Sequence, residues 1–272
     1  MFSVLILTRN EERNLPGCLD SVRGCDDIVV LDSLSTDRTV ALAGARGARV
    51  LTRAFTDFAD QRNWAHVHAE FRHEWVWHLD ADERFTPELR AECEAIAARP
   101  PPDLDGFFVA PRMLFMGRWI RHSTDFPAWQ TRFVRTRGFR FVQVGHGQRE
   151  APEMRVGRLR SSYEHLISAA TPAEWLEKHA RYAREEAAVI RAHPLRWGGE
   201  LRPLWHGPAL ERRRAAKRLW FRLPARPWLR FAYQYLWRGG WLDGYPGFCY
   251  CLRLSRYERL IARELRRAVP RA

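Results

Sequence analysis

Residues 75–83 read WVWHLDADE, an apolar run that ends in three carboxylates. Trp75–Leu79 has the length and composition of a strand that is buried on both faces of a sheet. Asp80 and Asp82 stand two positions apart directly after it, so one turn can present both side chains. Ligands of open α/β sheets bind outside the carboxyl ends of the strands. The stretch therefore predicts a buried strand that delivers two carboxylates to a binding site.

Short apolar runs and helix-like segments alternate on either side of this stretch. The alternation is typical of an α/β fold, Rossmann-like, with a mostly parallel sheet and helices on both faces. Beyond residue 110, aromatic and β-branched segments favour antiparallel or mixed strands. The expected strands are Ser3–Thr8, Asp27–Leu31, Ala48–Thr52, Trp75–Leu79, Gly106–Ala110 and, later, segments within 113–120, 129–136 and 139–144, and the expected early helices span residues 12–23, 36–46, 58–70 and 87–98.

Polar turns follow the first two expected strands. Residues 8–12 read TRNEE and residues 32–37 read DSLSTD. Asn10 can bind a nucleoside, and Asp32 can accept a hydrogen bond from a base N–H or a ribose hydroxyl, as acidic residues at strand ends do in nucleotide-binding folds. Each residue could instead cap a helix. Their common place at one sheet edge, beside Asp80, favours a binding site.

The two carboxylates after the fourth strand admit two interpretations. Asp80 and Asp82 can share a hard divalent cation, because Mg²⁺ and Mn²⁺ take few protein carboxylates and complete their shell with phosphate oxygens. Such a cation assists a diphosphate leaving group, on which charge builds as a sugar C1–O bond breaks. Alternatively, Asp82 and Glu83 are an acidic helix entry, because they lie just before a helix N-terminus, which favours negative charge.

Four segments, in order over about residues 1–95, resemble glycosyltransferase family 2. They are residues 7–12 (LTRNEE), similar to its opening strand and turn, 30–39 (VLDSLSTDRT), similar to its second strand and turn, 58–65 (FADQRNWA), similar to a helix whose Arg lies near the donor, and 79–83 (LDADE), similar to its metal motif. Leu34 stands where the family usually has Gly. The conformation of that turn is therefore open, although Asp32 should stay in the site.

This resemblance implies a GT-A fold, an inverting mechanism, a nucleotide-diphosphate-sugar donor and a divalent cation, Mg²⁺ or Mn²⁺. Asp82 would be the direct metal ligand, with Asp80 beside the ribose and the metal. Arg62 would approach the base or the diphosphate. The residues that would bind the donor nucleotide are Thr8, Asn10, Glu11, Asp32, Arg62 and Asp80.

The second half is similar, more loosely, to lipopolysaccharide-core β-glucosyltransferases. The similar segments are 127–133, 163–166, 177–183 and 240–244. This resemblance implies that the acceptor is a hydroxyl of a lipid-linked or lipopolysaccharide-core-type glycan, to which a hexose is transferred.

An inverting transfer needs a base that takes the proton from the acceptor hydroxyl. The relatives often carry Val-His-Glu at the corresponding strand end, whereas residues 144–150 here read VGHGQRE. Glu150 is the favoured base, because an acidic residue fills this role in the family. His146, whose ordinary pKa is already near neutrality, is one alternative, and Asp125 is another.

The C-terminal region is expected to be helical and is strongly basic. Residues 201–272 hold 17 basic and 4 acidic residues, which accounts for the whole net charge of +13. Thr171 and Glu174 form a capping-box pattern that predicts a helix to about residue 191. A basic amphipathic helix is expected over 207–222. A second capping-box pattern, formed by Ser255 and Glu258, predicts the start of a last helix.

Tryptophans and tyrosines interleave with the arginines of residues 201–272. This composition suits the headgroup layer of an anionic membrane. Packing of the aromatic residues against the catalytic domain explains it equally well. Nucleic acid is the less favoured partner, because no RRM, KH or helix-turn-helix signature accompanies the charge.

Residues 1–165 are therefore expected to form the catalytic domain, with a donor-binding half (1–110) and an acceptor-side half (111–165), and residues 166–272 a helical Arg/Trp-rich region. The sequence contains no run of 18 apolar residues, so no membrane-spanning helix is expected. We therefore expect a cytoplasmic protein, which is peripheral at the inner face of the plasma membrane if the basic region binds lipid.

The five cysteines show no CxxC pattern, which suggests that they are structural thiols.

Two other function classes compete with a glycosyltransferase. A Mg²⁺-dependent nucleotidyltransferase would also use carboxylates, but the Gly-rich basic phosphate loop with which such enzymes usually open is missing. A nucleic-acid-binding protein would explain the basic region but would leave the four N-terminal segments without a purpose.

Overall fold

The computed structural model describes residues 1–144, 147–167, 171–192 and 225–267, together with isolated positions between 208 and 223. The chain divides into two compact units. Unit 1 comprises Met1–Trp119 and Asp125–Ala169, and unit 2 comprises Ile120–Thr124 and Ala170–Ala272. Each unit is described by itself.

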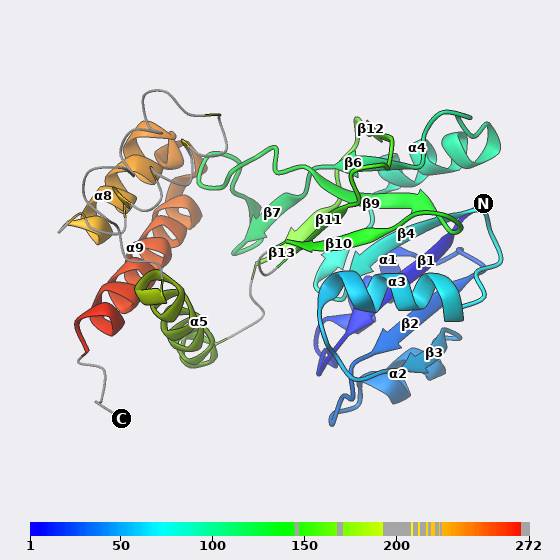
Figure 1. Ribbon diagram of the computed structural model, residues 1–272, viewed down its shortest axis with the longest axis horizontal. Helices are drawn as coiled ribbons and strands as arrows, with labels where there is room; N and C mark the ends of the chain where they lie inside the picture. Colours follow the sequence, from blue (N-terminus) through cyan, green and yellow to red (C-terminus); the bar gives the residue numbers. More distant parts are fainter. Residues whose placement is uncertain are drawn as a thin grey trace. The chain divides into compact units, whose positions relative to one another are not determined.

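A mixed sheet forms the centre of unit 1 (Figure 1). Its strands, within the described residues, are β1 (Ser3–Thr8), β2 (Ile28–Asp32), β3 (Arg49–Thr52), β4 (Trp75–Asp80), β6 (Gly106–Val109), β9 (Gln130–Arg135) and β12 (Val156–Arg158), in the order β12-β6-β9-β4-β1-β2-β3. β1 pairs in parallel with β2 and β4, and β2 with β3. β9 runs antiparallel between β4 and β6. The predicted mostly parallel α/β sheet is confirmed, as is the mixed pairing of the later strands.

Helices cover both faces of this sheet. They are α1 (Leu15–Ser21), α2 (Thr39–Ala45), α3 (Phe58–His68) and α4 (Pro87–Ala98). Successive strand residues point to opposite faces. Val4 and Ile6 of β1 accordingly pack in one core with residues of α1, α2 and α4, whereas Leu5 packs in a second core with residues of α3. Burial on both sides explains why these strands read as continuous apolar runs.

Two smaller sheets of unit 1 carry residues toward the end of β4. One contains β5 (Glu83–Arg84), β13 (Glu164–Leu166), β7 (Arg112–Phe115) and β8 (Arg118–Trp119), in the order β5-β13-β7-β8. The other is the hairpin of β10 (Phe141–Val144) and β11 (Gly147–Glu150). In the first sheet, His165 of β13 stands opposite Glu83 of β5. This register places a histidine beside the carboxylates that follow β4.

Unit 2 is helical in its described residues. Its elements are α5 (Pro172–Ala192), α8 (Arg226–Ala232), the π-helical turn η1 (Tyr233–Trp237), the 3₁₀ turn η2 (Gly240–Asp243) and α9 (Gly244–Arg266). The capping box that opens α5 is confirmed: the Thr171 N–H donates to Glu174 Oε2 (2.7 Å), and the Glu174 N–H donates to Thr171 Oγ1 (3.2 Å). Among the described residues, no helix is long and apolar enough to cross a bilayer.

The predicted start of the last helix at Ser255 is wrong. α9 begins at Gly244, and Ser255 is a buried residue in its middle. A serine followed three residues later by glutamate also occurs inside helices, where the small side chain allows close packing. The predicted helix over 207–222 lies largely outside the described residues.

Residues 120–124 belong to unit 2 because Asp243 binds them. The buried Asp243 carboxylate accepts hydrogen bonds from the His122 N–H (2.9 Å), the Ser123 N–H (2.7 Å) and the Ser123 hydroxyl (2.7 Å). Gly247 makes this approach possible, since a Cβ there would lie 2.3 Å from the Gly240 carbonyl oxygen and 2.9 Å from Ser123 Oγ.

Candidate functional site

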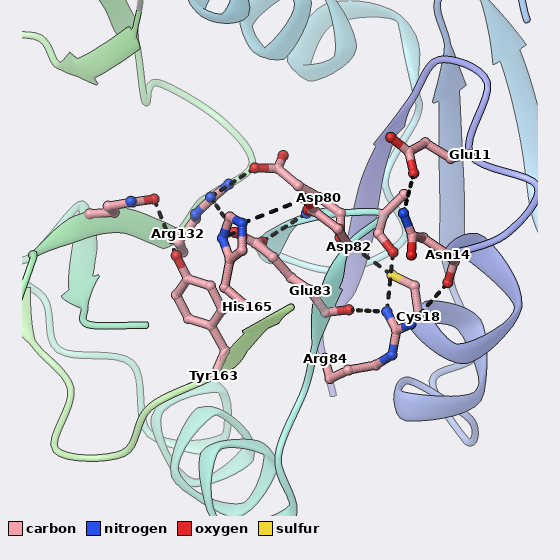
Figure 2. A network of polar contacts seen from close by, with 12 residues as sticks. Glu11, Asn14, Cys18, Asp80, Asp82, Glu83, Arg84, Arg132, Tyr163 and His165 are labelled. Atoms are coloured by element: carbon pink, nitrogen blue, oxygen red, sulfur yellow. Dashed lines mark hydrogen bonds and ion pairs between the residues drawn. The ribbon is translucent and has the colours of Figure 1, made fainter. Parts of the chain in front are cut away.

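Asp80, the last residue of β4, is held by two arginines. One carboxylate oxygen lies 2.9 Å from Arg62 Nη2 of α3 and the other 2.9 Å from Arg132 Nη2 of β9 (Figure 2 shows the Arg132 contact). Burial opposes ionisation, but the two guanidinium groups outweigh it and hold the pKa of Asp80 well below its ordinary value. Asp80 is therefore a fixed, ionised group whose charge is already compensated.

Arg62 is buried below this carboxylate and is 1% exposed. Its guanidinium lies 6.0 Å from the ring centroid of Phe141, and burial lowers its pKa. The sequence predicted Arg62 near the donor nucleotide. In the structure Arg62 forms an ion pair with Asp80 and so positions that carboxylate. Arg62 also lines the cavity described below.

Glu83 fixes the turn that follows β4. It is fully buried, accepts a hydrogen bond from the Asp80 N–H (2.8 Å) and lies 2.7 Å from Arg132 Nη2. Burial raises the pKa of Glu83, and the charge of Arg132 counters that effect. Glu83 precedes α4 by only a few residues, but it belongs to β5, and its carboxylate binds the Asp80 N–H and Arg132 while Thr86 caps the helix.

Asp82 is the more accessible carboxylate of the pair, with a side chain that is 37% exposed. Its Oδ2 lies 3.5 Å from Nε2 of His165, whose Nδ1 lies 3.4 Å from Glu83 Oε1 (Figure 2). Burial disfavours a charged imidazole, but the hydrogen bonds to Asp82 and Glu83 outweigh it and raise the pKa of His165 to about 10. Asp82 and His165 thus form a polar pair that solvent can reach.

The donor set of this pair fits a divalent cation. Carboxylate oxygen suits Mg²⁺ and Mn²⁺, and imidazole nitrogen is acceptable to transition metals such as Mn²⁺. Because a histidine ligand must be deprotonated, His165 would release the proton that faces Asp82 when the metal binds. Within the described residues, no group of three or more His, Cys, Asp or Glu side chains is arranged to hold a metal. A cation at Asp82 and His165 would therefore need further ligands from a bound phosphate and from water.

The turns after β1 and β2 are bound to each other. Asp32 is buried and accepts hydrogen bonds from the Thr8 hydroxyl (2.8 Å) and from the Ser35 N–H (2.7 Å). The Asn10 carboxamide accepts from the Thr36 N–H (2.8 Å). These contacts make one rigid polar rim at the carboxyl ends of the two strands.

Asn10 and Leu34 both adopt left-handed backbone conformations in this rim, with φ of 56° and 60°. Asn tolerates that region, whereas Leu pays a steric penalty in it. The turn that usually contains Gly in the resembling family is thus formed here with Leu34, whose side chain is 58% exposed. Asp32 keeps its contacts with Thr8 and Ser35 although Leu34 takes the place of Gly.

Glu11 lies in the turn between β1 and α1 and also contacts other residues of the rim. Its carboxylate accepts from Asn14 Nδ2 (2.8 Å), and its N–H donates to the Thr39 hydroxyl (2.8 Å). Thr8, Asn10, Glu11 and Asp32 are therefore gathered at the end of β1 and β2, next in the sheet to the end of β4.

A cavity of about 340 Å³ joins several of the predicted site residues. Arg62, Asp80, Arg132 and His165 line it together with Glu150, at the end of β11. The Glu150 carboxylate accepts a hydrogen bond from the Thr131 hydroxyl (2.7 Å), which fixes its orientation. Cationic side chains, a compensated carboxylate and an oriented second carboxylate thus share one space, which suits an anionic ligand beside a proton acceptor.

The other two candidate bases are placed differently. Asp125 is exposed, directly precedes the cis Phe126–Pro127 bond and is not among the residues that line the cavity. His146 lies outside the described residues.

Sequence reasoning did not assign His165 and Arg132 to the candidate site, although both line the cavity. Both fall in the segments that resemble lipopolysaccharide-core enzymes, but similarity along the chain does not indicate which strand faces which. The pairing of β13 with β5, and of β9 with β4, is what brings them to the carboxylates.

The chain is similar to known glycosyltransferases. Residues 3–156 match the model of the family described as glycosyl transferase family 2. An uncharacterized glycosyltransferase of Rickettsia bellii (strain RML369-C) is 33% identical over 102 residues, 37% of this chain and 34% of that protein. The lipopolysaccharide core biosynthesis glycosyltransferase LpsC of Rhizobium meliloti (strain 1021) is 31% identical over 120 residues, 42% of this chain and 43% of that protein.

These matches thus span about a third to under half of the curated relatives' lengths. Among solved structures, S. aureus TarS 1-349 in complex with UDP-GlcNAc aligns with a TM-score of 0.44 and 17% identity, over 97% of this chain and 89% of that one. The family model covers more than half of the chain, including β1, β4, the hairpin that carries Glu150 and every residue that lines the cavity except His165. The chain is a member of glycosyltransferase family 2.

Proposed function

We propose that this protein transfers a hexose from a nucleotide-diphosphate sugar to a hydroxyl group of a glycan, with inversion at the sugar C1. The observation that carries the proposal is the cavity that holds Asp80, His165 and Glu150 together. Family membership supports the donor class. Similarity to LpsC, named for lipopolysaccharide core biosynthesis, supports a lipid-linked or lipopolysaccharide-core-type acceptor.

The rim formed by the turns after β1 and β2 is the proposed nucleoside site. Asn10 is exposed there, while Thr8 and Asp32 hold the turn that presents it. Glu11 completes the rim through its contact with Asn14. Because these groups fix one another before any ligand arrives, the site pays little ordering cost on binding.

Asp82 and His165 are the proposed ligands of a Mg²⁺ or Mn²⁺ ion that arrives with the diphosphate. When bound, such an ion neutralises the charge that grows on the leaving diphosphate. Arg62 and Arg132 keep Asp80 ionised and rigid beside it. These fixed charges need little rearrangement during the reaction, which is the main source of electrostatic catalysis.

Glu150 is the proposed base. The hydrogen bond from Thr131 leaves its carboxylate ready to accept the proton of an acceptor hydroxyl that enters the same cavity. It is contributed by β11, whereas Asp80 and His165 come from β4 and β13, so the acceptor and the donor are served by separate elements. His146 and Asp125 remain the alternatives.

The proposed catalytic domain is residues 1–165, with donor functions in 1–110 and acceptor functions in 111–165. Residues 166–272 form the proposed helical accessory region.

Incubation with a panel of nucleotide-diphosphate sugars, with and without Mn²⁺, tests the activity. We expect slow hydrolysis of one donor that depends on the metal, and a rise in melting temperature with that donor, since a ligand of the native state stabilises it. Incorporation of nucleotide from a nucleoside triphosphate, with no response to any sugar nucleotide, would instead indicate a nucleotidyltransferase.

A further inference from the structure

A second cavity, of about 930 Å³, lies within unit 2 between α5, α8 and α9. One part of its lining is apolar and is formed by Leu176 of α5, Trp228 and Phe231 of α8, and Phe248 and Leu252 of α9. We refer to this cavity as the α5–α8–α9 groove. Its apolar lining is open to solvent, since Trp228 is 69% exposed and Leu252 is 45% exposed.

The rest of the groove is strongly cationic. Five exposed arginines line it: Arg184 of α5, Arg256, Arg259 and Arg263 of α9, and Arg267 directly after α9. Glu264 is the one acidic residue among the described lining, and it pairs with Arg267 at 2.8 Å. The arginines therefore outnumber the carboxylate and create a positive potential over one part of the groove.

The apolar and cationic parts follow one another along a single face of α9. Phe248, Leu252, Arg256, Arg259 and Arg263 recur every three or four residues, the spacing of one helix face. At 1.5 Å per residue, the apolar part from Phe248 to Leu252 spans about 6 Å of this face, and the cationic part from Arg256 to Arg263 spans about 10 Å. The face thus changes from apolar to cationic along its length, as a phospholipid changes from hydrocarbon chain to headgroup.

The walls of the groove are joined by interior contacts. The Arg226 guanidinium of α8 forms an ion pair with Glu258 of α9, and both side chains are largely buried. Arg191 of α5 donates hydrogen bonds to the carbonyl oxygens of Glu264 and Arg267 at the end of α9, the second at 2.9 Å. None of these contacts uses the side chain of Arg256, Arg259 or Arg263, so these three arginines can be replaced without removing the contacts.

Tryptophan in the same unit favours a bilayer over a soluble anion. Arg259 lies 6.0 Å above the Trp228 ring, and Trp237 and Trp241 are 84% and 56% exposed. Tryptophan concentrates where hydrocarbon meets headgroups, and arginine is attracted to anionic lipid. A free phosphate would use the arginines but would leave the apolar lining in water.

We propose that the α5–α8–α9 groove binds the phosphate and part of the hydrocarbon chain of an anionic phospholipid, so that unit 2 docks on the surface of an anionic bilayer. The arginines bind the phosphate, while Trp228, Phe248 and Leu252 contact the chain. This inference stands on unit 2 and does not depend on the donor chemistry of unit 1.

Flotation of the full chain with vesicles tests it. One set of vesicles contains phosphatidylcholine alone, and the other contains equal parts of phosphatidylcholine and phosphatidylglycerol. We expect binding to the anionic vesicles, and a loss of about a hundredfold in partition coefficient in the triple variant Arg256→Gln/Arg259→Gln/Arg263→Gln. The matched control, Arg118→Gln/Arg137→Gln/Arg160→Gln, removes three exposed arginines of unit 1 and should retain wild-type binding.

A second variant separates the apolar contribution from charge. Leu252→Gln leaves every arginine in place and should weaken binding severalfold. Brominated phosphatidylglycerol should quench tryptophan fluorescence in the wild type, and less so in Trp228→Phe. Circular dichroism and size exclusion verify that each variant is folded.

Several results would overturn the proposal. Equal losses in the groove triple and its control would show that net charge alone drives binding, and unchanged binding in the groove triple would exclude the arginines. If Leu252→Gln binds the anionic vesicles as well as the wild type does, and brominated lipid does not quench tryptophan fluorescence, contact with the hydrocarbon chain is excluded. If single-stranded RNA displaces the protein from the vesicles at the same salt concentration, and the groove triple variant no longer binds RNA, the groove is assigned to nucleic acid instead.

Discussion

The guanidinium of Arg132 lies 2.7 Å from the carboxylate of Glu83, and Glu83 has no solvent-exposed surface. Arg132 also binds Asp80, so a single cation serves the buried Glu83 and the half-buried Asp80. Removing one partner of a buried ion pair typically costs 3–5 kcal/mol, because the remaining charge loses its compensation.

We therefore expect Arg132→Met to lower the free energy of unfolding by about 3–5 kcal/mol, measured by urea denaturation. Arg140→Met provides the matched control, because Arg140 pairs with Glu153 on the surface. An exposed pair contributes about 1 kcal/mol or less. Equal losses in the two variants would show that the Arg132 network does not stabilise the fold.

Asp82→Asn should abolish the response to Mn²⁺ while leaving the fold intact, since the Asp82 side chain is partly exposed. Donor turnover should fall about 100-fold or more, as when an enzyme loses one contact to developing charge. Asp103→Asn, an exposed carboxylate on the same unit, should behave as wild type. Calorimetric titration of Mn²⁺ in the presence of the nucleoside diphosphate of the active donor checks the binding step, and unchanged turnover in Asp82→Asn would remove the metal assignment.

Glu150→Gln should keep donor binding but reduce transfer by about 10²–10⁴-fold, because general base catalysis contributes on that scale. Donor binding is read from thermal stabilisation, and transfer from product formed on an acceptor glycan. His146→Gln and Asp125→Asn, assayed in parallel, should transfer normally. If Glu150→Gln transfers at the wild-type rate, the role passes to whichever of these two variants is inactive.

The stacked histidines His66 and His78 predict a loss of stability in acid. Their Nε2 atoms lie 3.0 Å apart, and burial lowers the pKa of His66 to about 4 and that of His78 well below its ordinary value. An unfolded histidine titrates near 6.5, so between pH 6.5 and 4 the unfolded chain takes up protons that the folded chain cannot. Folding is therefore weakened as the pH falls.

With a pKa of about 4 for His66 in the folded chain and about 6.5 in the unfolded chain, the free energy of unfolding falls by about 2 kcal/mol between pH 7 and pH 5. His66→Gln removes that contribution, so its stability should fall less steeply over the same interval. Urea denaturation at pH 7, 6 and 5 measures the difference. Parallel curves for the variant and the wild type would contradict the buried, neutral state of His66.

The elements of the first half of the chain were predictable because both faces of their sheet are covered. A strand such as Ser3–Thr8 is then a continuous apolar run between polar turns, and its bounds were predicted without error. α4 was predicted equally well, because Thr86 and Pro87 are local signals for a helix start. Helix ends near α1 were less accurate, since no capping side chain marks them.

The interior of the site could not be predicted in the same way. His165 reaches Asp82 only because β13 pairs with β5, and these strands are about 80 residues apart. Apolar patterns indicate that a segment is a strand, but they do not indicate its partner. The carboxylates of the LDADE segment were visible from the sequence, whereas the cations that compensate them were not.

Residues 120–124 belong to unit 2, although the segments on either side of them belong to unit 1. Asp243 binds this short segment, so the C-terminal unit is assembled from two pieces of sequence and the chain passes between the units three times. Recombination that joins a new tail after residue 165 would bring in a helical module that lacks its own five-residue piece. Inheritance of the two units together is therefore favoured, and exchange of the C-terminal region among related enzymes should require matching changes around Ser123.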